Sequence, residues 1–98
     1  MKLPANGWKN KNGTGNRSCR CGSWKNHWLN FSGTAWPNEC SVYKCHNSAD
    51  LGAHICNSKV SGERIIPMCL SCNRRTDTFS LKEGVTLVSA NKSETCEK

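Results

Sequence analysis

Apolar residues fall in short runs separated by polar, turn-forming stretches. Residues 51–56 and 64–68 form two apolar-rich runs of strand length, with serines and a glycine between them. This arrangement predicts a β-hairpin. Residues 84–90 carry apolar side chains at both odd and even positions, which predicts a last strand covered on both faces.

A different spacing marks the N-terminal half. Trp24, Trp28 and Phe31 stand at positions i, i+4 and i+7, so a helix would place all three rings on one face. Ser23 is a suitable N-cap and Gly33 a suitable stop for that helix. An aromatic stripe at this spacing is more often core than a stacking platform for bases, and we interpret it as core.

Two close cysteine pairs flank the predicted hairpin. Cys40 and Cys45 have four residues between them, and Cys69 and Cys72 have two. Each pair can form a turn that supplies two thiolates, and a tetrahedral zinc ion would join the two turns. The second pair opens a predicted short helix, whose N-terminal N–H groups favour thiolate. The order of knuckle, hairpin and short helix predicts a treble clef. The fold class expected is therefore a small α+β zinc-stabilised domain, with the aromatic helix and the C-terminal strand added to a ββα core.

Composition agrees with a metal-stapled domain. The chain has 98 residues, and its 36% of apolar residues includes eight cysteines, so little remains for an ordinary core. We expect a basic flexible arm over residues 1–17 and a single domain over 18–98. No secretory signal or membrane-length apolar run stands out, which favours the cytoplasm, reduced thiols and bound metal over a disulfide scaffold.

Charge points toward a polyanionic partner. The formal net charge is +7, and two zinc–thiolate sites would lower it to about +4. Residues 1–38 hold six basic residues and no acid. Such a segment favours nucleic acid, although a solvated tail is an equal alternative for residues 1–17.

A second metal site is also conceivable in this sequence. Besides the two cysteine pairs, four candidate zinc ligands remain in the N-terminal and C-terminal segments. A second site built from them would leave Cys56 as the only cysteine that is not a zinc ligand. The alternative is that His27 is a surface or partly buried residue and that these cysteines are free. We interpret His46 as a surface residue and Cys56 as a small buried thiol. The candidate ligands are Cys19, Cys21, His27 and Cys96.

The stretch around the second cysteine pair resembles a known family. A histidine at the end of the first strand (His54), then Ile-Ile-Pro-Met at 65–68 and Cys-x-x-Cys-Asn-Arg-Arg at 69–75, looks like the HNH nuclease motif in its zinc-stapled form. The resemblance implies a ββα-metal fold. It also implies that His54 would be the general base and that Asn73 would occupy the helix position that holds a divalent metal such as Mg²⁺.

Two departures separate the chain from that family. Ala53 stands where the family has an acidic or histidine metal ligand, and Arg64 lies near the place of its central asparagine. The chain also resembles a family of uncharacterised small bacterial and phage proteins with the motifs CxCGSWxxHW, GAH and VSANxxETC, matched here at 19–28, 52–54 and 88–96. That likeness implies a shared fold and no particular reaction.

Two functions therefore compete. The first is a zinc module that binds nucleic acid, or a protein partner, without catalysis, which we favour. The second is a metal-dependent HNH-type endonuclease. In either case the candidate phosphate-contacting residues are Arg74, Arg75, Lys59, Arg20 and Lys25.

Overall fold

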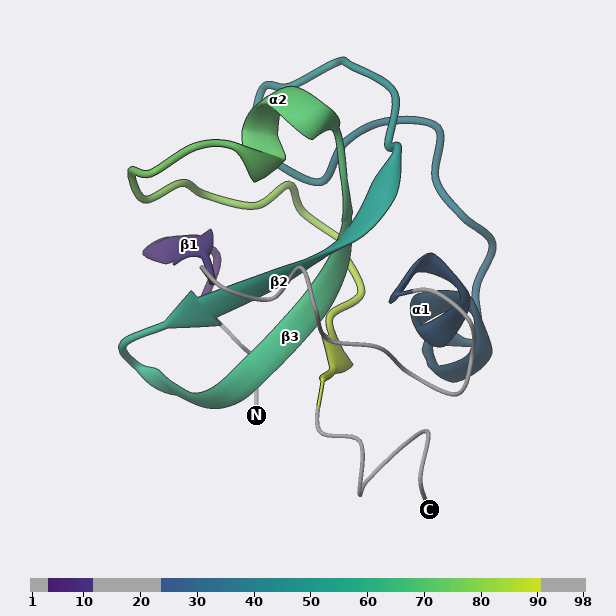
Figure 1. Ribbon diagram of the computed structural model, residues 1–98, viewed down its shortest axis with the longest axis horizontal. Helices are drawn as coiled ribbons and strands as arrows, with labels where there is room; N and C mark the ends of the chain where they lie inside the picture. Colours follow the sequence, from purple (N-terminus) through teal and green to yellow (C-terminus); the bar gives the residue numbers. More distant parts are fainter. Residues whose placement is uncertain (1–3, 12–23, 91–98) are drawn as a thin grey trace.

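The computed structural model describes residues 4–11 and 24–90 of the chain. Within these ranges the protein is an α+β domain, built on a four-stranded antiparallel sheet of strand order β1-β2-β3-β4 (Figure 1). A 9-residue helix, α1, and a 4-residue helix, α2, accompany the sheet. In chain order the elements are β1 (Trp8–Asn10), α1 (Trp24–Ser32), β2 (Leu51–Asn57), β3 (Val60–Met68), α2 (Leu70–Asn73) and β4 (Val88–Ser89).

The β2–β3 hairpin is the centre of the fold and confirms the sequence prediction. Leu51 pairs with Met68, and the register holds as far as Ile55 opposite Arg64. Nearer the turn the register shifts, and β3 continues through Gly62, whose φ of +80° suits glycine. The hairpin is therefore longer than predicted, because 60–63 belong to the strand.

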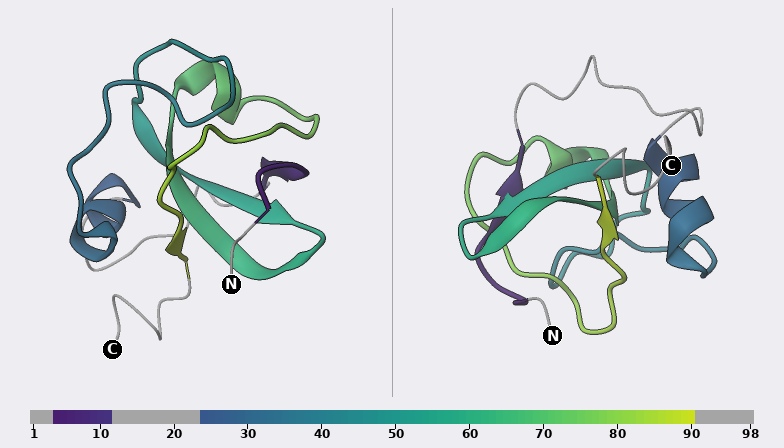
Figure 2. Two further views of the ribbon diagram at one scale, coloured as in Figure 1. Left: turned by 180° about the vertical axis from the view of Figure 1, so that it is seen from behind. Right: turned by 90° about the horizontal axis from the view of Figure 1, so that it is seen from below.

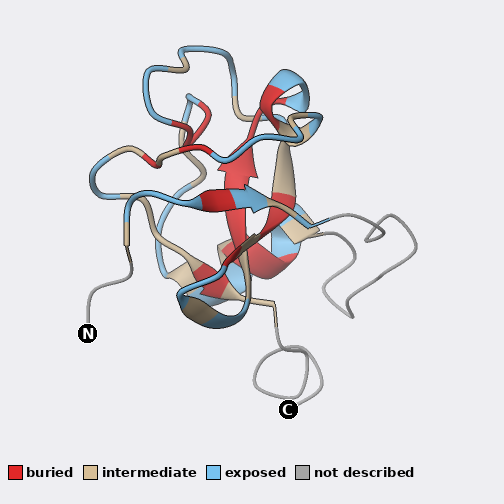
Figure 3. Cartoon of the chain, turned by 90° about the vertical axis from the view of Figure 1, so that its left-hand side faces the viewer, coloured by how far each residue is buried: buried red, intermediate tan, exposed pale blue. Residues whose placement is uncertain are grey.

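The two faces of the hairpin carry two separate cores. Ala53, Ile55 and Ile66 lie in a cluster that also contains Cys40, Cys69 and Cys72. Cys45, the fourth cysteine of the predicted zinc site, packs against this cluster. Ile65 belongs to a second cluster with Trp28 and Val88. Side chains alternate between the faces of a strand, so neighbours such as Ile65 and Ile66 enter different cores. Figure 3 shows buried positions along the hairpin strands.

Helix α1 covers the face of the hairpin opposite α2 (Figure 1), and the views in Figure 2 agree. The predicted helix is confirmed, and Trp28 is buried within it. Phe31, which we expected in the core, is 44% exposed. Its place is taken by His27, which is fully buried and whose Nε2 lies 2.8 Å from the carbonyl oxygen of Ser89. The aromatic helix therefore packs away from the cysteines and does not cover their turns.

Part of the expected flexible arm is built into the sheet. Residues 8–10 form β1, which pairs with β2 and places Trp8 opposite Asn57. Trp8 also exchanges two backbone hydrogen bonds with Phe79, of 3.2 and 2.8 Å. Its side chain is fully buried, and Nε1 donates to the Pro4 carbonyl at 2.7 Å. For these residues, the arm assignment is wrong.

The last strand is shorter than the sequence indicates. β4 spans Val88–Ser89, whereas we predicted a strand over 84–90. Trp28 explains part of the difference, because its Nε1 donates to the Thr86 carbonyl at 2.9 Å. The Thr86 carbonyl thus accepts a hydrogen bond from a side chain of α1, and the chain pairs with β3 only at residues 88 and 89.

Gly52 sets the distance between α1 and the sheet. A Cβ atom at this position would lie 2.6 Å from the Trp24 carbonyl carbon. We expect Gly52→Ala to push α1 outward and to destabilise the protein by about 1–3 kcal/mol, the usual cost of overpacking. Chemical denaturation measures the change, with the exposed Ser61→Ala as control. Equal stability of the two variants would contradict this packing.

Candidate metal centre

Folding brings the two predicted cysteine pairs together. The sulfur atoms of Cys40, Cys45, Cys69 and Cys72 all lie within 4.8 Å of one another. The Sγ of Cys45 lies 3.8 Å from that of Cys69 and 3.7 Å from that of Cys72. A tetrahedral zinc ion with bonds of about 2.3 Å places its sulfur ligands about 3.8 Å apart. The spacing of the four thiols therefore fits zinc, and within residues 4–11 and 24–90 they are the only group of three or more Cys, His, Asp or Glu side chains placed to hold a metal ion.

The first pair sits on a tight turn. The Cys45 N–H donates to the Val42 carbonyl at 3.0 Å, and Lys44 takes a left-handed φ of 67° to close the turn. The Cys40 N–H donates to the Asn47 carbonyl at 2.9 Å, on the far side of the loop. These bonds direct both thiols to one point.

The second pair sits at the start of α2. Cys69 is the N-cap residue, and its Sγ accepts a hydrogen bond from the Cys72 N–H at 3.4 Å. Asn47 Nδ2 lies 3.8 Å from the same sulfur. Asp50 fixes the helix start, because its carboxylate accepts from the Leu70 N–H at 3.2 Å. Neither Asn47 nor Asp50 was identified from the sequence, since a polar loop residue carries no spacing signal.

The thiols differ in how readily they ionise before a metal binds. Burial raises the pKa of Cys40 and of Cys72, and a neighbouring thiol raises that of Cys72 further. Burial also opposes ionisation of Cys69, but hydrogen bonds from Cys72, Asn47 and Cys45 outweigh it and lower its pKa to about 7. Among Cys40, Cys69 and Cys72, Cys69 therefore ionises most readily.

These shifts predict a steep pH dependence of metal affinity. Zinc binds thiolates, so binding near neutral pH must release the protons of Cys40 and Cys72 and part of that of Cys69. Their raised pKa values mean that more protons are displaced, and affinity falls as pH falls. We expect a loss of about a hundredfold or more per pH unit, measured by competition with a chromophoric chelator. An affinity independent of pH between 6 and 8 would contradict thiolate ligation.

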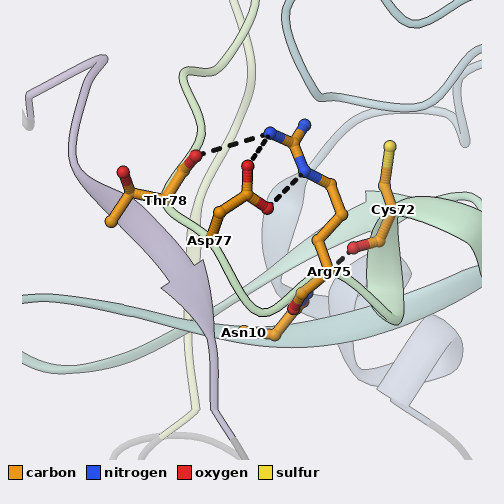
Figure 4. A network of polar contacts seen from close by, with 5 residues as sticks. All are labelled: Asn10, Cys72, Arg75, Asp77 and Thr78. Atoms are coloured by element: carbon orange, nitrogen blue, oxygen red, sulfur yellow. Dashed lines mark hydrogen bonds and ion pairs between the residues drawn. The ribbon is translucent and has the colours of Figure 1, made fainter.

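A polar network joins β1 to α2, the helix that begins at the second cysteine pair (Figure 4). Asn10 Nδ2 donates to the carbonyls of Cys72, at 2.8 Å, and Arg75, at 2.9 Å, just where α2 ends. Arg75 in turn makes two hydrogen bonds to the Asp77 carboxylate, of 2.9 and 2.7 Å, and lies 5.4 Å from the centre of the Phe79 ring. The side chain of Asn10 thus ties β1 directly to the end of the helix that carries Cys72.

The structure does not bring the candidate catalytic residues together. His54 lies in the middle of β2, not at its end, and is only 5% exposed. Its ring packs 4.2 Å from that of Trp24, on the α1 face. Asn73 ends α2, on the other face of the hairpin (Figure 1). Ala53 is buried opposite Ile66.

The residues expected to contact nucleic acid differ in their exposure and in the groups that they contact. Arg74 and Lys59 are exposed. Arg75 is engaged by Asp77, and Lys25, which lies on α1, is 4.8 Å from the centre of the Trp36 ring. Arg64, near the position of the missing central asparagine, bonds to the carbonyls of its own strand. Arg20 lies outside the described residues.

Of the second predicted zinc site, only His27 lies within the described residues; Cys19, Cys21 and Cys96 lie outside them. His46 is an exposed residue beside Glu39, with 3.4 Å between Nδ1 and the carboxylate, as expected of a surface histidine. Cys56 is half-buried on β2.

No helix in the described part of the chain has the length and apolar character needed to cross a bilayer. Comparisons with protein-family models, curated proteins and solved structures find no match to this chain.

Proposed function

We propose that this protein is a zinc-stapled module that binds nucleic acid without cleaving it, on a treble-clef scaffold like that of HNH proteins. The observation that carries the proposal is the cluster of four thiols, with spacings that fit tetrahedral zinc. Zinc closed off by four cysteines has no open position, which is typical of a structural rather than a catalytic site.

The surroundings of His54 favour binding over catalysis. A general base has to reach the water that it activates. His54 is instead buried beneath Trp24, and Asn73 lies across the hairpin from it. Ala53 offers no metal ligand, and it is buried in the core that contains the cysteines.

Charge supports nucleic acid as the partner. The chain is strongly basic, and two acids within the described ranges are paired with basic residues: Glu39 with Lys82, and Asp77 with Arg75. Arg74 and Lys59 remain exposed for contacts to phosphate. Because the zinc site needs reduced thiols, we place the protein in the cytoplasm.

A cleavage and binding assay tests the proposal. Purified zinc-loaded protein is incubated with supercoiled plasmid in EDTA, and then with added magnesium, manganese or nickel, beside His54→Ala. We expect salt-sensitive binding and no nicking under any condition. Nicking that needs the added metal and disappears in His54→Ala would establish the endonuclease instead.

We also propose a second zinc ion, held by His27 with Cys19, Cys21 and Cys96. His27 supports it, because a metal-binding histidine commonly uses its other ring nitrogen on a backbone carbonyl, and Nε2 of His27 lies against that of Ser89. Native mass spectrometry tests the count. Two zinc ions per chain, and one after His27→Ala, are expected; a single ion in the wild type would remove this site.

A further inference from the structure

We propose that Cys45 is an oxidation site, at which a peroxide forms a disulfide between Cys45 and a sulfur of the second cysteine pair and thereby releases the zinc ion. The inference rests on the four-cysteine zinc site of the proposed function and is independent of nucleic acid as the partner. It adds a second state to that site, in which a covalent bond between the first cysteine turn and α2 replaces the metal.

The four thiols of the cluster differ in how far solvent reaches them. Cys40 is 0% exposed, Cys69 2% and Cys72 7%. Cys45 is half-buried, and it is the only one of the four that is not buried. The residues on both sides of it in the chain, at 43, 44 and 46–48, are exposed. A small oxidant dissolved in water therefore meets Cys45 before the other three thiols.

Exposure, and not acidity, decides which sulfur reacts once zinc is bound. A zinc site of four cysteines binds every sulfur as thiolate. The thiolate is the form of cysteine that attacks an oxidant. Differences in acidity among the free thiols therefore no longer matter in the zinc-bound protein, and the most accessible sulfur, that of Cys45, reacts first.

Two partners for an oxidised Cys45 lie next to it. Its Sγ lies 3.7 Å from that of Cys72 and 3.8 Å from that of Cys69. Both partners belong to the second pair, at the start of α2, so either disulfide would join the first cysteine turn to that helix. Cys56 on β2 is also half-buried, but it does not belong to the four-cysteine group. Cys56 is therefore a control thiol that is half-buried like Cys45 but lies outside the cluster.

The reaction consumes one peroxide molecule and two thiolates. The Cys45 sulfur attacks one oxygen of hydrogen peroxide, the O–O bond breaks, and the leaving hydroxide takes up a proton to become water. The thiolate of Cys69 or Cys72 then attacks the sulfenic acid on Cys45. The S–S bond forms, the S–O bond breaks, and a second hydroxide leaves and is protonated to water. The two sulfurs lose two electrons, which the peroxide gains. Two thiolates remain of the four that a closed zinc site needs, so the ion leaves.

Peptide mapping of the oxidised protein identifies the bond. Zinc-loaded protein is treated with hydrogen peroxide beside a chromophoric zinc chelator, and a sample without peroxide gives the background. Samples are then blocked with an alkylating reagent and digested with trypsin. Trypsin separates Cys40, in peptide 26–44, from Cys45, in peptide 45–59, and both from the second pair, in peptide 65–74. We expect a cross-link between peptides 45–59 and 65–74, with one zinc ion released for each cross-link formed.

Two variants assign the cross-link to Cys45. Peptide 45–59 also contains Cys56, so Cys56→Ser should form the same cross-link and release zinc at the wild-type rate. Cys45→His keeps a zinc ligand, because zinc sites of three cysteines and one histidine are common, but it cannot form the disulfide. We expect peroxide to release its zinc more slowly, by about tenfold or more. A reducing thiol and added zinc should restore the metal-bound wild type.

The results separate this site from the alternatives. A disulfide confined to peptide 65–74, or a cross-link that disappears in Cys56→Ser, would overturn the inference, as would zinc release from Cys45→His at the wild-type rate. Wild-type protein that keeps its zinc while Cys56 is oxidised would also overturn it. If Cys45→His takes up no zinc, the peptide maps of the wild type and of Cys56→Ser decide. Protein that carries no zinc before peroxide is added would overturn the proposed function as well.

Discussion

Replacing Cys72 with serine is expected to release the zinc ion and to unfold the protein. Cys72 is buried, and its sulfur lies 3.7 Å from that of Cys45. Structural zinc contributes about 10–16 kcal/mol of binding free energy in small domains, whereas a whole domain is stable by only about 5–15 kcal/mol. Losing one of four ligands removes enough of that contribution to leave the chain unfolded at room temperature. Native mass spectrometry and near-ultraviolet circular dichroism measure the two losses.

Cys56→Ser is the matched control for Cys72→Ser. Cys56 is a half-buried thiol of β2 and does not belong to the four-cysteine group. This variant should keep the wild-type zinc count and spectrum. A folded Cys72→Ser protein with the wild-type zinc count would contradict the assignment of the ligands.

Trp8→Ala should cost about 3–5 kcal/mol of folding free energy, the usual cost of truncating a buried large aromatic residue. The Trp8 ring is fully buried in the core that contains the cysteines, although it comes from the segment expected to be an arm. The substitution also removes the hydrogen bond from Nε1 to the Pro4 carbonyl. Urea unfolding of the zinc-loaded protein measures the loss.

The exposed Tyr43 supplies an aromatic control for Trp8→Ala. Its side chain lies on the first cysteine turn and is 57% exposed, so Tyr43→Ala should change stability by no more than about 0.5 kcal/mol. If Trp8→Ala unfolded at the wild-type urea concentration, residues 8–10 would not be part of the folded sheet.

The four-cysteine cluster and the hairpin were predictable because their sequence signals are local. The spacing of Cys40, Cys45, Cys69 and Cys72 specifies two turns that can share an ion, and all four thiols do meet. The apolar runs specify the hairpin, and the spacing of Trp24 and Trp28 specifies α1. Each cysteine pair, each apolar run and the spacing of the two tryptophans lies within a short stretch of the chain, so local geometry is enough to interpret it.

The remaining features depend on contacts between distant segments. β1 has only three residues, of which Trp8 alone is buried. It is held by Phe79, 71 positions from Trp8 in the sequence, and by the hydrogen bonds of its own Asn10 to the end of α2. Helical spacing identified the aromatic face of α1 but not which side of the sheet it covers. Gly52 permits the observed packing, because a Cβ atom at this position would clash with the backbone of Trp24. The exposure of Phe31 and the burial of His27 follow from the same packing.

The most direct test of this account is removal of the metal. Protein kept under reducing conditions is followed by near-ultraviolet circular dichroism while a strong chelator is added, and zinc is then returned. We predict that the signal of the packed tryptophans disappears as zinc leaves and returns when zinc is restored. An unchanged spectrum in protein shown by mass spectrometry to be free of metal would contradict the claim that zinc bound by four thiolates holds this fold together.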